Sequence, residues 1–308
     1  MQAENTLMTT QPLVTVIIPS YNHERYIAQA IESVSSQSYK EIELIVIDDG
    51  SKDQSLKIIN TLAEKHGIIV IARENRGLAK TLNEGVGLAN GKYISFLASD
   101  DYYLPSRIEN AVLQFEKSAN KVAAVYCDGY IINDEGDKKC SFGERYPRPL
   151  IGNVYNNLLV GNWIPALGMT YRTEVLKEFM FDERFQVEDH TLYLRMFKSK
   201  KNKLVFYNAF DFAYRLHNSN MSGSEELINN ENTLMQDNFT DMGRFAKFKQ
   251  QLKTRDDIGV EVVRYKNYYL LYLQKIRWLQ NKSMSDHRSI LGLFFFYILR
   301  LNRKICGE

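Results

Sequence analysis

Residues 14–53 read VTVIIPSYNHERYIAQAIESVSSQSYKEIELIVIDDGSKD, two apolar runs on either side of an amphipathic segment. The runs VTVIIP and IELIVID are continuous and rich in β-branched residues, which is typical of buried strands. Between them, Ile27, Ala30, Ile31 and Val34 recur at helical spacing. A strand, a helix and a strand of this length predict parallel strands joined by a right-handed crossover.

The same alternation continues to residue 97. Helical periodicity returns in residues 53–66 and 77–90, and short apolar runs return in residues 68–72 and 92–97. Repeated strand–helix units predict an α/β protein with a Rossmann-like, mostly parallel sheet that is covered by helices on both faces.

After Pro105 the alternation loosens. Periodicity there predicts helices over 107–118, 174–179 and 188–199, strands over 122–133, 166–172 and 210–217, and loop with a short helix over 140–165. The resulting organisation is a disordered lead-in over 1–12, an α/β domain over 13–222 and a helical C-terminal extension over 223–308.

Charge is distributed unevenly along the chain, although the net charge is only +2. Residues 244–308 hold 14 Lys and Arg against 5 Asp and Glu, a net +9, so the rest carries −7. The small total argues against a nucleic-acid partner, and the basic extension predicts contact with an anionic membrane surface. Its apolar run at 290–299, flanked by basic residues, spans about 15 Å as a helix, half of a bilayer core. We therefore expect peripheral membrane contact, with packing on the α/β domain or homo-oligomer contact as alternatives.

The three cysteines, Cys127, Cys140 and Cys306, show no CxxC spacing and are odd in number. This pattern argues against a disulfide framework or a zinc site and favours a reducing compartment. Residues 1–12 have no basic segment followed by an apolar one, so they do not read as a signal peptide. We expect a cytoplasmic protein, at the inner face of the cytoplasmic membrane if the extension binds lipid.

Polar residues gather where the predicted strands end, which is the edge of such sheets that binds ligands. The ends carry Pro19, Ser20, Tyr21 and Asn22 after the first strand, Asp48, Asp49 and Gly50 after the second, and Ser99, Asp100 and Asp101 after the fourth. An edge with so many carboxylates predicts a site for a cation. Mn²⁺ or Mg²⁺ shared with a nucleoside diphosphate takes carboxylate oxygens as ligands.

The two adjacent aspartates are expected to have different roles, because neighbouring residues of an extended chain point in opposite directions. The hypothesis assigns Asp101 to the metal and Asp100 to the nucleotide. Asp48 and Asp49 are placed to accept hydrogen bonds from the base or ribose, and Gly50 allows close approach of the backbone.

Three blocks of the sequence, VTVIIPSYNHERYIAQAIESVSSQSYKEIELIVIDDGSKD, ENRGLAKTLNEGVGLANGKYISFLASDD and FDERFQVEDHTLYLRM, resemble the family 2 glycosyltransferases, inverting enzymes of the GT-A fold. The resemblance covers about residues 13–220. It implies that Asp49 and the loop from Pro19 to Asn22, with Tyr21, hold the nucleotide and that the SDD stretch binds the metal. It also implies that the Glu188–Asp189 pair supplies the catalytic base, mostly Asp189, and that Arg215 and His217 match an R-x-H element whose histidine is a further metal ligand.

The chain departs from the family pattern in two places. Many members carry an aspartate where this chain has Ala98, so metal binding depends on fewer carboxylates. The AARN often seen after the GL pair is here KTLN, so the arginine that faces a phosphate is missing. Lys80, with Arg76, is left as the candidate phosphate contact.

Together these features predict metal-dependent, inverting transfer of a sugar from a nucleotide-sugar donor, expected to be UDP-linked, to a saccharide acceptor. The basic and aromatic extension favours a lipid-linked acceptor, as in bacterial surface polysaccharide or O-antigen assembly. The alternatives are a catalytically silent scaffold with this fold and a sugar-nucleotide nucleotidyltransferase, although the latter needs a glycine-rich basic loop that PSYNHERY does not provide.

Each predicted site residue also has a purely structural interpretation. Asp100–Asp101 can precede a helix as its N-cap, and Glu188–Asp189 can favour a helix start through the helix dipole. His217 can be a buried structural histidine, and Arg76 and Lys80 can be solvated helix charges. Trp163 is placed equally well in the core or as a stacking platform for a sugar ring.

Overall fold

The computed structural model describes residues 11–118, 122–149, 153–158, 161–185, 188–218 and 220. All of these except Gly161 belong to one compact unit of the chain. The extension over 223–308, with its predicted membrane or oligomer contact, and the lead-in up to residue 10 lie outside the described residues.

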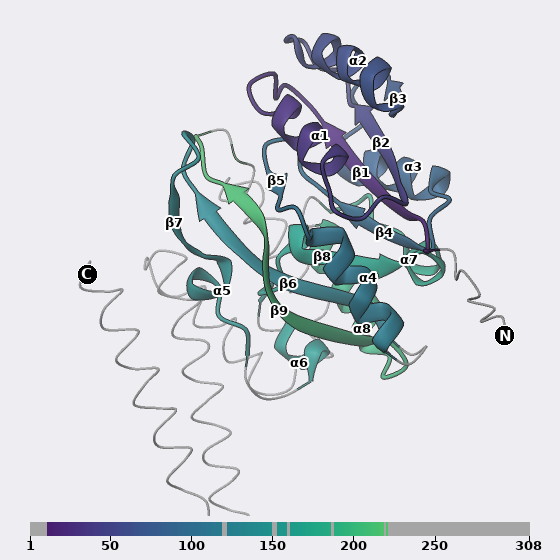
Figure 1. The fold of residues 1–308 in the computed structure, drawn as a ribbon. Helices are drawn as coiled ribbons and strands as arrows, with labels where there is room; N and C mark the ends of the chain where they lie inside the picture. The colour runs from purple at the N-terminus through teal and green to yellow at the C-terminus, as the bar shows by residue number, and fades with distance from the viewer. Residues whose placement is uncertain are drawn as a thin grey trace, which may run out of the picture. The chain divides into compact units, whose positions relative to one another are not determined.

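Nine strands of the described residues form a single sheet in the order β3-β2-β1-β4-β8-β6-β9-β5, with β7 pairing with β6 (Figure 1). The strands are β1 (Val14–Ser20), β2 (Ile42–Asp48), β3 (Ile69–Ala72), β4 (Tyr93–Phe96), β5 (Tyr102–Tyr103), β6 (Val122–Ile132), β7 (Lys138–Ser141), β8 (Met169–Arg172) and β9 (Lys203–Arg215).

Helices connect and cover these strands (Figure 1). They are α1 (Ile27–Ser35), α2 (Ser55–His66), α3 (Leu78–Leu88), α4 (Arg107–Lys117), α5 (Phe142–Arg145), α6 (Val154–Leu158), α7 (Thr173–Phe179) and α8 (Glu188–Lys198), with a 3₁₀ turn η1 (Ala166–Gly168) before β8.

The N-terminal half confirms the prediction of parallel strands covered on both faces. β1 pairs in parallel with β2 and with β4, and β2 pairs in parallel with β3. Val16 and Ile18 of β1 pack in a core cluster with residues of α1, α2 and α4. Ile17 points to the other face, where α3 lies so close that a Cβ on Gly85 would meet the Ile17 side chain at 2.7 Å. Both faces of β1 are therefore buried, which explains its unbroken apolar run.

The C-terminal half contains pairings that the periodicity did not predict. β8 is antiparallel to both β4 and β6, whereas β6 and β9 run parallel to each other. The predicted strand over 210–217 is longer and begins at Lys203, and the short strands β5 and β7 were not predicted. The sheet is therefore mixed but mostly parallel.

The strand directions fix which segments meet at the carboxyl edge of β4. Because β8 is antiparallel to β4, with Thr170 opposite Ser95, the loop before β8 approaches β8 from that edge. β9 begins opposite Val122, the first residue of β6, so the chain after α8 runs to the opposite edge. α8 has 11 residues and spans about 16 Å, and its last residue, Lys198, precedes β9 by five residues.

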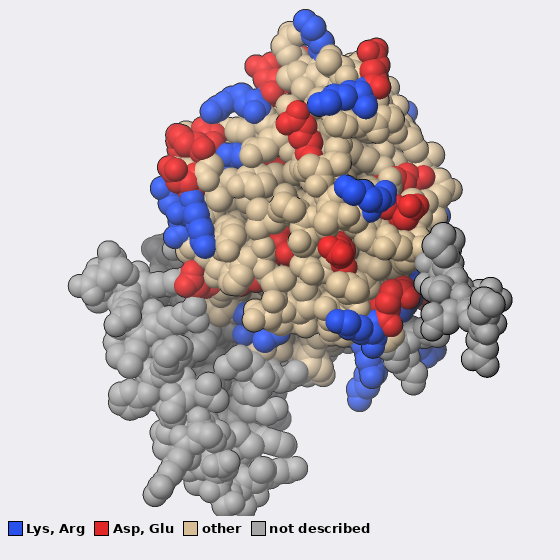
Figure 2. Space-filling model, viewed as in Figure 1, with Lys and Arg blue, Asp and Glu red and all other residues tan. Residues whose placement is uncertain are grey.

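Basic and acidic side chains are interspersed on the face shown in Figure 2, with broad uncharged areas between them. No continuous basic stripe crosses the described residues of this face. In the part of the chain that the structure describes, no helix is both long and apolar enough to cross a membrane.

Candidate active site

The loops after β1 and β2 are joined by a network of hydrogen bonds. The Asn22 N–H donates to Ser51 Oγ (3.0 Å), and Asn22 Oδ1 accepts from the Lys52 N–H (2.7 Å). Asn22 adopts a φ of +54°, in the left-handed region that Asn tolerates better than most residues. The neighbouring Tyr21 side chain is 46% exposed. Asn22 therefore joins the loops after β1 and β2, and the exposed Tyr21 side chain is accessible to a ligand. Pro19 lies within β1.

Asp48 and Ser20 lie opposite each other at the ends of β2 and β1. Asp48 Oδ2 accepts a hydrogen bond from the Ser51 N–H (3.0 Å). Asp48 Oδ1 and Ser20 Oγ are buried and have no hydrogen-bond partner among the described residues. Buried polar atoms without partners are costly, so this pair is suited to meeting polar atoms of a ligand.

Asp49 organises the loop that leads into α3. Its carboxylate accepts hydrogen bonds from the Arg76 N–H (2.8 Å), the Gly77 N–H (3.0 Å) and the guanidinium of Arg73. Arg73, which sequence reasoning missed, also donates to Glu84 Oε2 (2.7 Å), so it joins this loop to α3. Asp49 is 5% exposed, and the structure gives it a positioning role beside the predicted nucleotide contact.

Arg76 and Lys80, the predicted phosphate contacts, carry exposed side chains at the start of α3. The structure leaves both accessible at the carboxyl edge. Their role toward a phosphate stays a prediction.

Gly50, after Asp49, is held in a conformation that only glycine tolerates well. Its φ is +79°, and an added Cβ would lie 2.7 Å from the Asn75 backbone nitrogen. We expect Gly50→Ala to lower the free energy of unfolding by about 2–4 kcal/mol, measured by urea unfolding. Gly67→Ala is the matched control, because Gly67 has a φ of +66° in open space and should lose only about 1 kcal/mol. Equal losses for the two variants would contradict the crowding argument.

Asp100 lies beside two histidines from distant parts of the chain. His217 Nε2 lies 3.0 Å from Asp100 Oδ2, and His23 Nε2 lies 4.0 Å from the same oxygen. One ligand atom from each of the three residues lies within 4.8 Å of the other two. Burial lowers the pKa of His23, against the opposing effect of the Asp100 carboxylate, so the neutral imidazole that binds metals is favoured. A carboxylate oxygen and two imidazole nitrogens at this spacing fit a divalent cation.

Asp101 is turned away from this cluster. Its Oδ1 accepts a hydrogen bond from the Arg215 N–H (2.7 Å), and the side chain is 2% exposed. Burial, with the nearby Asp100 carboxylate, raises the pKa of Asp101 well above its usual range. The extended-chain rule behind the predicted assignment does not apply, because the chain turns after β4 and the Asp101 N–H donates to the Ala98 carbonyl (3.1 Å). The geometry therefore favours Asp100 over Asp101 as the metal-facing carboxylate, and metal binding at Asp100 stays a prediction.

Arg215 is the last residue of β9 and holds the loop after β4 that carries Asp100 and Asp101, which we call the aspartate loop. Its Nε donates to the Asp100 carbonyl (3.0 Å), and one terminal nitrogen donates to Gln29 Oε1 of α1 (2.6 Å). The other terminal nitrogen donates to the Asp134 carbonyl (2.8 Å). The guanidinium thus bonds backbone and amide oxygens and leaves the Asp100 carboxylate to the histidines.

Glu188 and Asp189 begin α8, and their environments separate them. Asp189 Oδ2 accepts a hydrogen bond from Asn162 Nδ2 (2.8 Å), and its Oδ1 accepts from the His190 N–H (2.6 Å). Burial, with the adjacent Asp189 charge, raises the pKa of Glu188 to about 8. At neutral pH Glu188 is therefore mostly protonated, which leaves Asp189 as the better proton acceptor of the pair.

The raised pKa of Glu188 predicts a pH-dependent stability. A carboxyl whose pKa is higher in the folded state stabilises the fold at low pH and loses this contribution as the pH rises from about 4.5 through about 8. We expect Glu188→Gln to gain stability relative to the unsubstituted protein over this window, measured by urea unfolding from pH 5 to about 9. Glu178→Gln, at an exposed position of α7, is the control, and a pH-independent difference for Glu188→Gln would contradict the interpretation.

The cluster of Asp100, His23 and His217 (the metal-capable cluster) and the acidic pair Glu188–Asp189 lie toward the same edge of the sheet. Asn162, which holds Asp189, belongs to the loop before β8, and that loop approaches β8 from the carboxyl end of β4, where Asp100 lies. Phe96, at the end of β4, contacts Tyr171 of β8, whose hydroxyl bonds Tyr193 of α8 (3.2 Å). The predicted carboxylates thus converge on one side of the domain.

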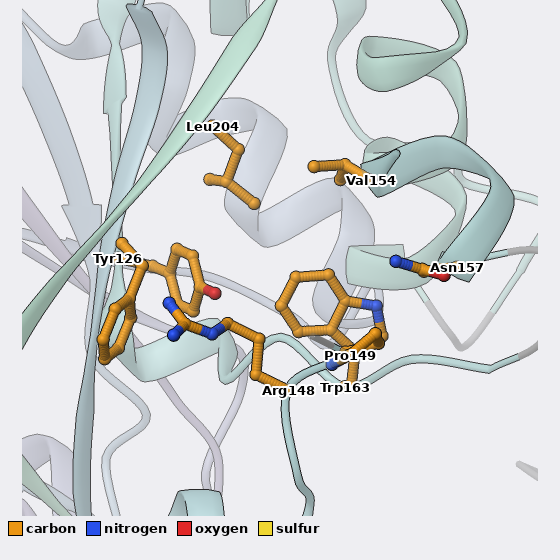
Figure 3. A pocket seen from close by; sticks show the side chains of 8 residues that line it. Tyr126, Arg148, Pro149, Val154, Asn157, Trp163 and Leu204 are labelled. Atoms are coloured by element: carbon orange, nitrogen blue, oxygen red, sulfur yellow. The ribbon is translucent and has the colours of Figure 1, made fainter. Parts of the chain in front are cut away.

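A cavity of about 270 Å³ is bordered by Tyr126 of β6, by Leu204 and Phe206 near the start of β9, and by Trp163 from the loop before β8 (Figure 3). Trp163 is 5% exposed and meets Tyr126 of β6 edge-on, with ring centroids 5.8 Å apart. Its Nε1 has no hydrogen-bond partner among the described residues. Arg148 and Asn157 add polar groups to the lining. Trp163 is therefore packed in the interior and forms part of a cavity wall, and stacking on a sugar ring stays a prediction.

A mostly parallel sheet with acidic loops at its carboxyl edge, a metal-capable cluster and a carboxylate pair on the facing helix is the arrangement of the GT-A glycosyltransferases. The chain belongs to glycosyl transferase family 2, since residues 15–180 match the family of that description. An uncharacterized glycosyltransferase of Rickettsia prowazekii is 43% identical over 124 residues, which is 40% of this chain and 38% of that protein. The chain thus matches about two fifths of that relative's length.

Two solved structures share the fold at low sequence identity. TarS from S. aureus in complex with UDP-GlcNAc superposes with a TM-score of 0.58 and 19% identity, over 83% of this chain and 70% of that one. The mannosyltransferase PcManGT from Pyrobaculum calidifontis in complex with GDP-Man and Mn²⁺ gives a TM-score of 0.56 and 14% identity, over 97% and 89%. These similarities confirm the predicted GT-A fold.

Proposed function

We propose that this protein transfers a sugar from a nucleotide-sugar donor to a saccharide acceptor, with inversion at the anomeric carbon and with help from a divalent cation. The observation that carries the proposal is the convergence of the Asp100 cluster and Asp189 toward one edge of the sheet. One group of residues can hold the diphosphate end of a donor through a cation, and the other can take a proton from an acceptor.

UDP is the donor nucleotide that we propose. TarS binds UDP-GlcNAc on the same fold, whereas PcManGT binds GDP-Man, so the fold accepts either base. In this chain the base and ribose are assigned to the ends of β1 and β2, where Asp48 Oδ1 and Ser20 Oγ offer polar atoms without partners among the described residues. The exposed Tyr21 is available for stacking, and the exposed Arg76 and Lys80 for phosphate contact.

The chemistry follows from charge and proton positions. When bound by Asp100 and His217, Mn²⁺ or Mg²⁺ supplies positive charge against the leaving diphosphate. Asp189 accepts the proton of the attacking acceptor hydroxyl, a role that typically contributes about 10²–10⁴-fold in rate. The Asn162 amide and the His190 N–H orient its two oxygens for this transfer. Glu188, mostly protonated at neutral pH, can donate a hydrogen bond there but is a poor proton acceptor.

The acceptor saccharide is assigned to the cavity lined by Trp163. An indole face and aromatic neighbours suit the apolar face of a pyranose ring, and the unpartnered Nε1 can donate to a hydroxyl. A lipid-linked acceptor in bacterial surface polysaccharide or O-antigen assembly at the inner membrane face is proposed from the basic extension, which lies outside the described residues.

The test is a panel of UDP- and GDP-sugars incubated with the full chain, Mn²⁺ and candidate acceptors, with release of nucleoside diphosphate as the readout. Release that requires both the cation and a donor supports the proposal. Pyrophosphate release instead identifies the nucleotidyltransferase alternative. No release from any donor, with unchanged thermal stability in their presence, favours the scaffold alternative.

A further inference from the structure

His23 is not among the site residues predicted from the sequence, yet it lies in the cluster with Asp100 and His217. The loop after β4 contributes only one carboxylate to that cluster, because position 98 is alanine and Asp101 is bonded to the Arg215 backbone. His23 comes from the loop after β1, and its Nε2 lies 4.0 Å from Asp100 Oδ2. The side chain is 22% exposed, so the imidazole is accessible.

The distances within the cluster match those between ligands of one cation. Ligands about 2.1 Å from a metal lie about 3.0 Å apart in adjacent octahedral positions and about 4.2 Å apart in opposite ones. His217 Nε2 and Asp100 Oδ2 are 3.0 Å apart, and His23 Nε2 and Asp100 Oδ2 are 4.0 Å apart. All three ligand atoms lie within 4.8 Å of one another, so adjustment of the two imidazole side chains brings them to one ion.

The surroundings of His23 hold its ring in the orientation that a ligand needs. Its Nδ1 is 2.7 Å from Ser99 Oγ, and its backbone N–H donates to Ser55 Oγ at the start of α2 (3.0 Å). If Nδ1 donates to the serine, the neutral ring presents Nε2 as the free electron pair, which is the usual pattern for a metal-bound histidine. Tyr26 stacks on His217, with ring centroids 5.1 Å apart, and meets His23 edge-on at 6.1 Å, so one ring supports both imidazoles.

We propose that His23 is the third protein ligand of the cation, so that the site has two imidazoles and one carboxylate and takes Mn²⁺ or a similar transition metal in preference to Mg²⁺. Imidazole nitrogens suit first-row transition metals, whereas Mg²⁺ prefers oxygen ligands throughout. Three protein ligands already gathered also allow the ion to bind before the nucleotide. This inference rests on the proposed function, because it concerns the cation of the same site.

The experiment measures Mn²⁺ binding to the full chain without any nucleotide, by electron paramagnetic resonance, so that it does not depend on activity. We expect one bound Mn²⁺ whose electron spin-echo modulation shows two coordinated imidazole nitrogens. His23→Ala should remove one of them and weaken binding at least about 10-fold. Mg²⁺ in about 100-fold excess over Mn²⁺ should leave most of the Mn²⁺ bound to the unsubstituted protein. His66→Ala, at an exposed position of α2, is the control and should change nothing.

The spectrum of the unsubstituted protein counts the imidazoles even if His23→Ala folds poorly. A single imidazole in that spectrum, or Mn²⁺ affinity unchanged in a folded His23→Ala protein, overturns the role of His23. Should His217→Ala abolish Mn²⁺ binding in that case, the proposed function stands without the third ligand. No Mn²⁺ binding, together with no donor-dependent release of nucleoside diphosphate, overturns both proposals.

Discussion

Asp100→Asn is expected to abolish Mn²⁺ binding and to lower the rate of sugar transfer by about 10²–10³-fold, while the fold stays intact. The carboxylate is the only charged ligand in the cluster with His217 and His23. An amide keeps the shape and one acceptor oxygen but removes the charge that offsets a divalent cation. Transfer is measured as nucleoside diphosphate release with Mn²⁺ present, and folding by urea unfolding.

Asp101→Asn is the matched control, the same chemical change one residue along. The asparagine oxygen can still accept the hydrogen bond of the Arg215 N–H, so the aspartate loop keeps its place. Because burial raises the pKa of Asp101, its charge destabilises the fold as the pH rises, and the amide should be at least as stable at pH 8. If Asp101→Asn loses Mn²⁺ binding and Asp100→Asn does not, the original assignment from the sequence is right and the geometric one is wrong.

Asp189→Asn is expected to lower kcat by about 10²–10⁴-fold with little change in donor binding, because the amide cannot accept a proton from the acceptor. The Asp189 carboxylate accepts hydrogen bonds from Asn162 Nδ2 and the His190 N–H. We therefore expect the substitution to change only the immediate surroundings of this residue. Donor binding is followed by thermal stabilisation with the donor and Mn²⁺, and kcat by nucleoside diphosphate release at saturating acceptor.

Glu188→Gln separates the two members of the acidic pair. Its pKa of about 8 leaves the glutamate mostly protonated at neutral pH, so the glutamine resembles the species already present. The loss of kcat should therefore be much smaller than for Asp189→Asn. Comparable losses in the two variants would show that both carboxyl groups are needed in their charged forms and would contradict the assignment of Asp189 as the base.

The parallel core was predictable from the sequence because its strands are buried on both faces. β1, β2 and β4 are mostly apolar, and α1 buries Ile27, Ala30, Ile31 and Val34 as the periodicity predicts. β7, by contrast, has the sequence KKCS and is partly exposed, and β5 has two residues, so neither carries a hydrophobic pattern. The antiparallel direction of β8 was also hidden, because periodicity within one strand says nothing of its partner's direction.

The candidate site was predicted in its residue types but not in its detailed geometry. The roles predicted for Asp100 and Asp101 assume an extended chain, whereas the chain turns at residues 98–101, so their order stays a prediction that the two asparagine variants test. His23 was missed because its neighbours Ser99 and His217 lie 76 and 194 residues away along the chain, and no local pattern marks such a contact. The signal available was its position in a loop at the carboxyl end of a strand, where any imidazole is a candidate ligand.

The long strand β9 has a consequence for synthesis. Its last residue, Arg215, fastens the aspartate loop to α1, and His217 lies two residues further along the chain. A nascent chain on the ribosome can pair the four strands from β1 to β4 early, because they follow one another in the sequence. It cannot complete the proposed cation site until nearly the whole domain has emerged, so a prematurely terminated product should not carry out the proposed sugar transfer.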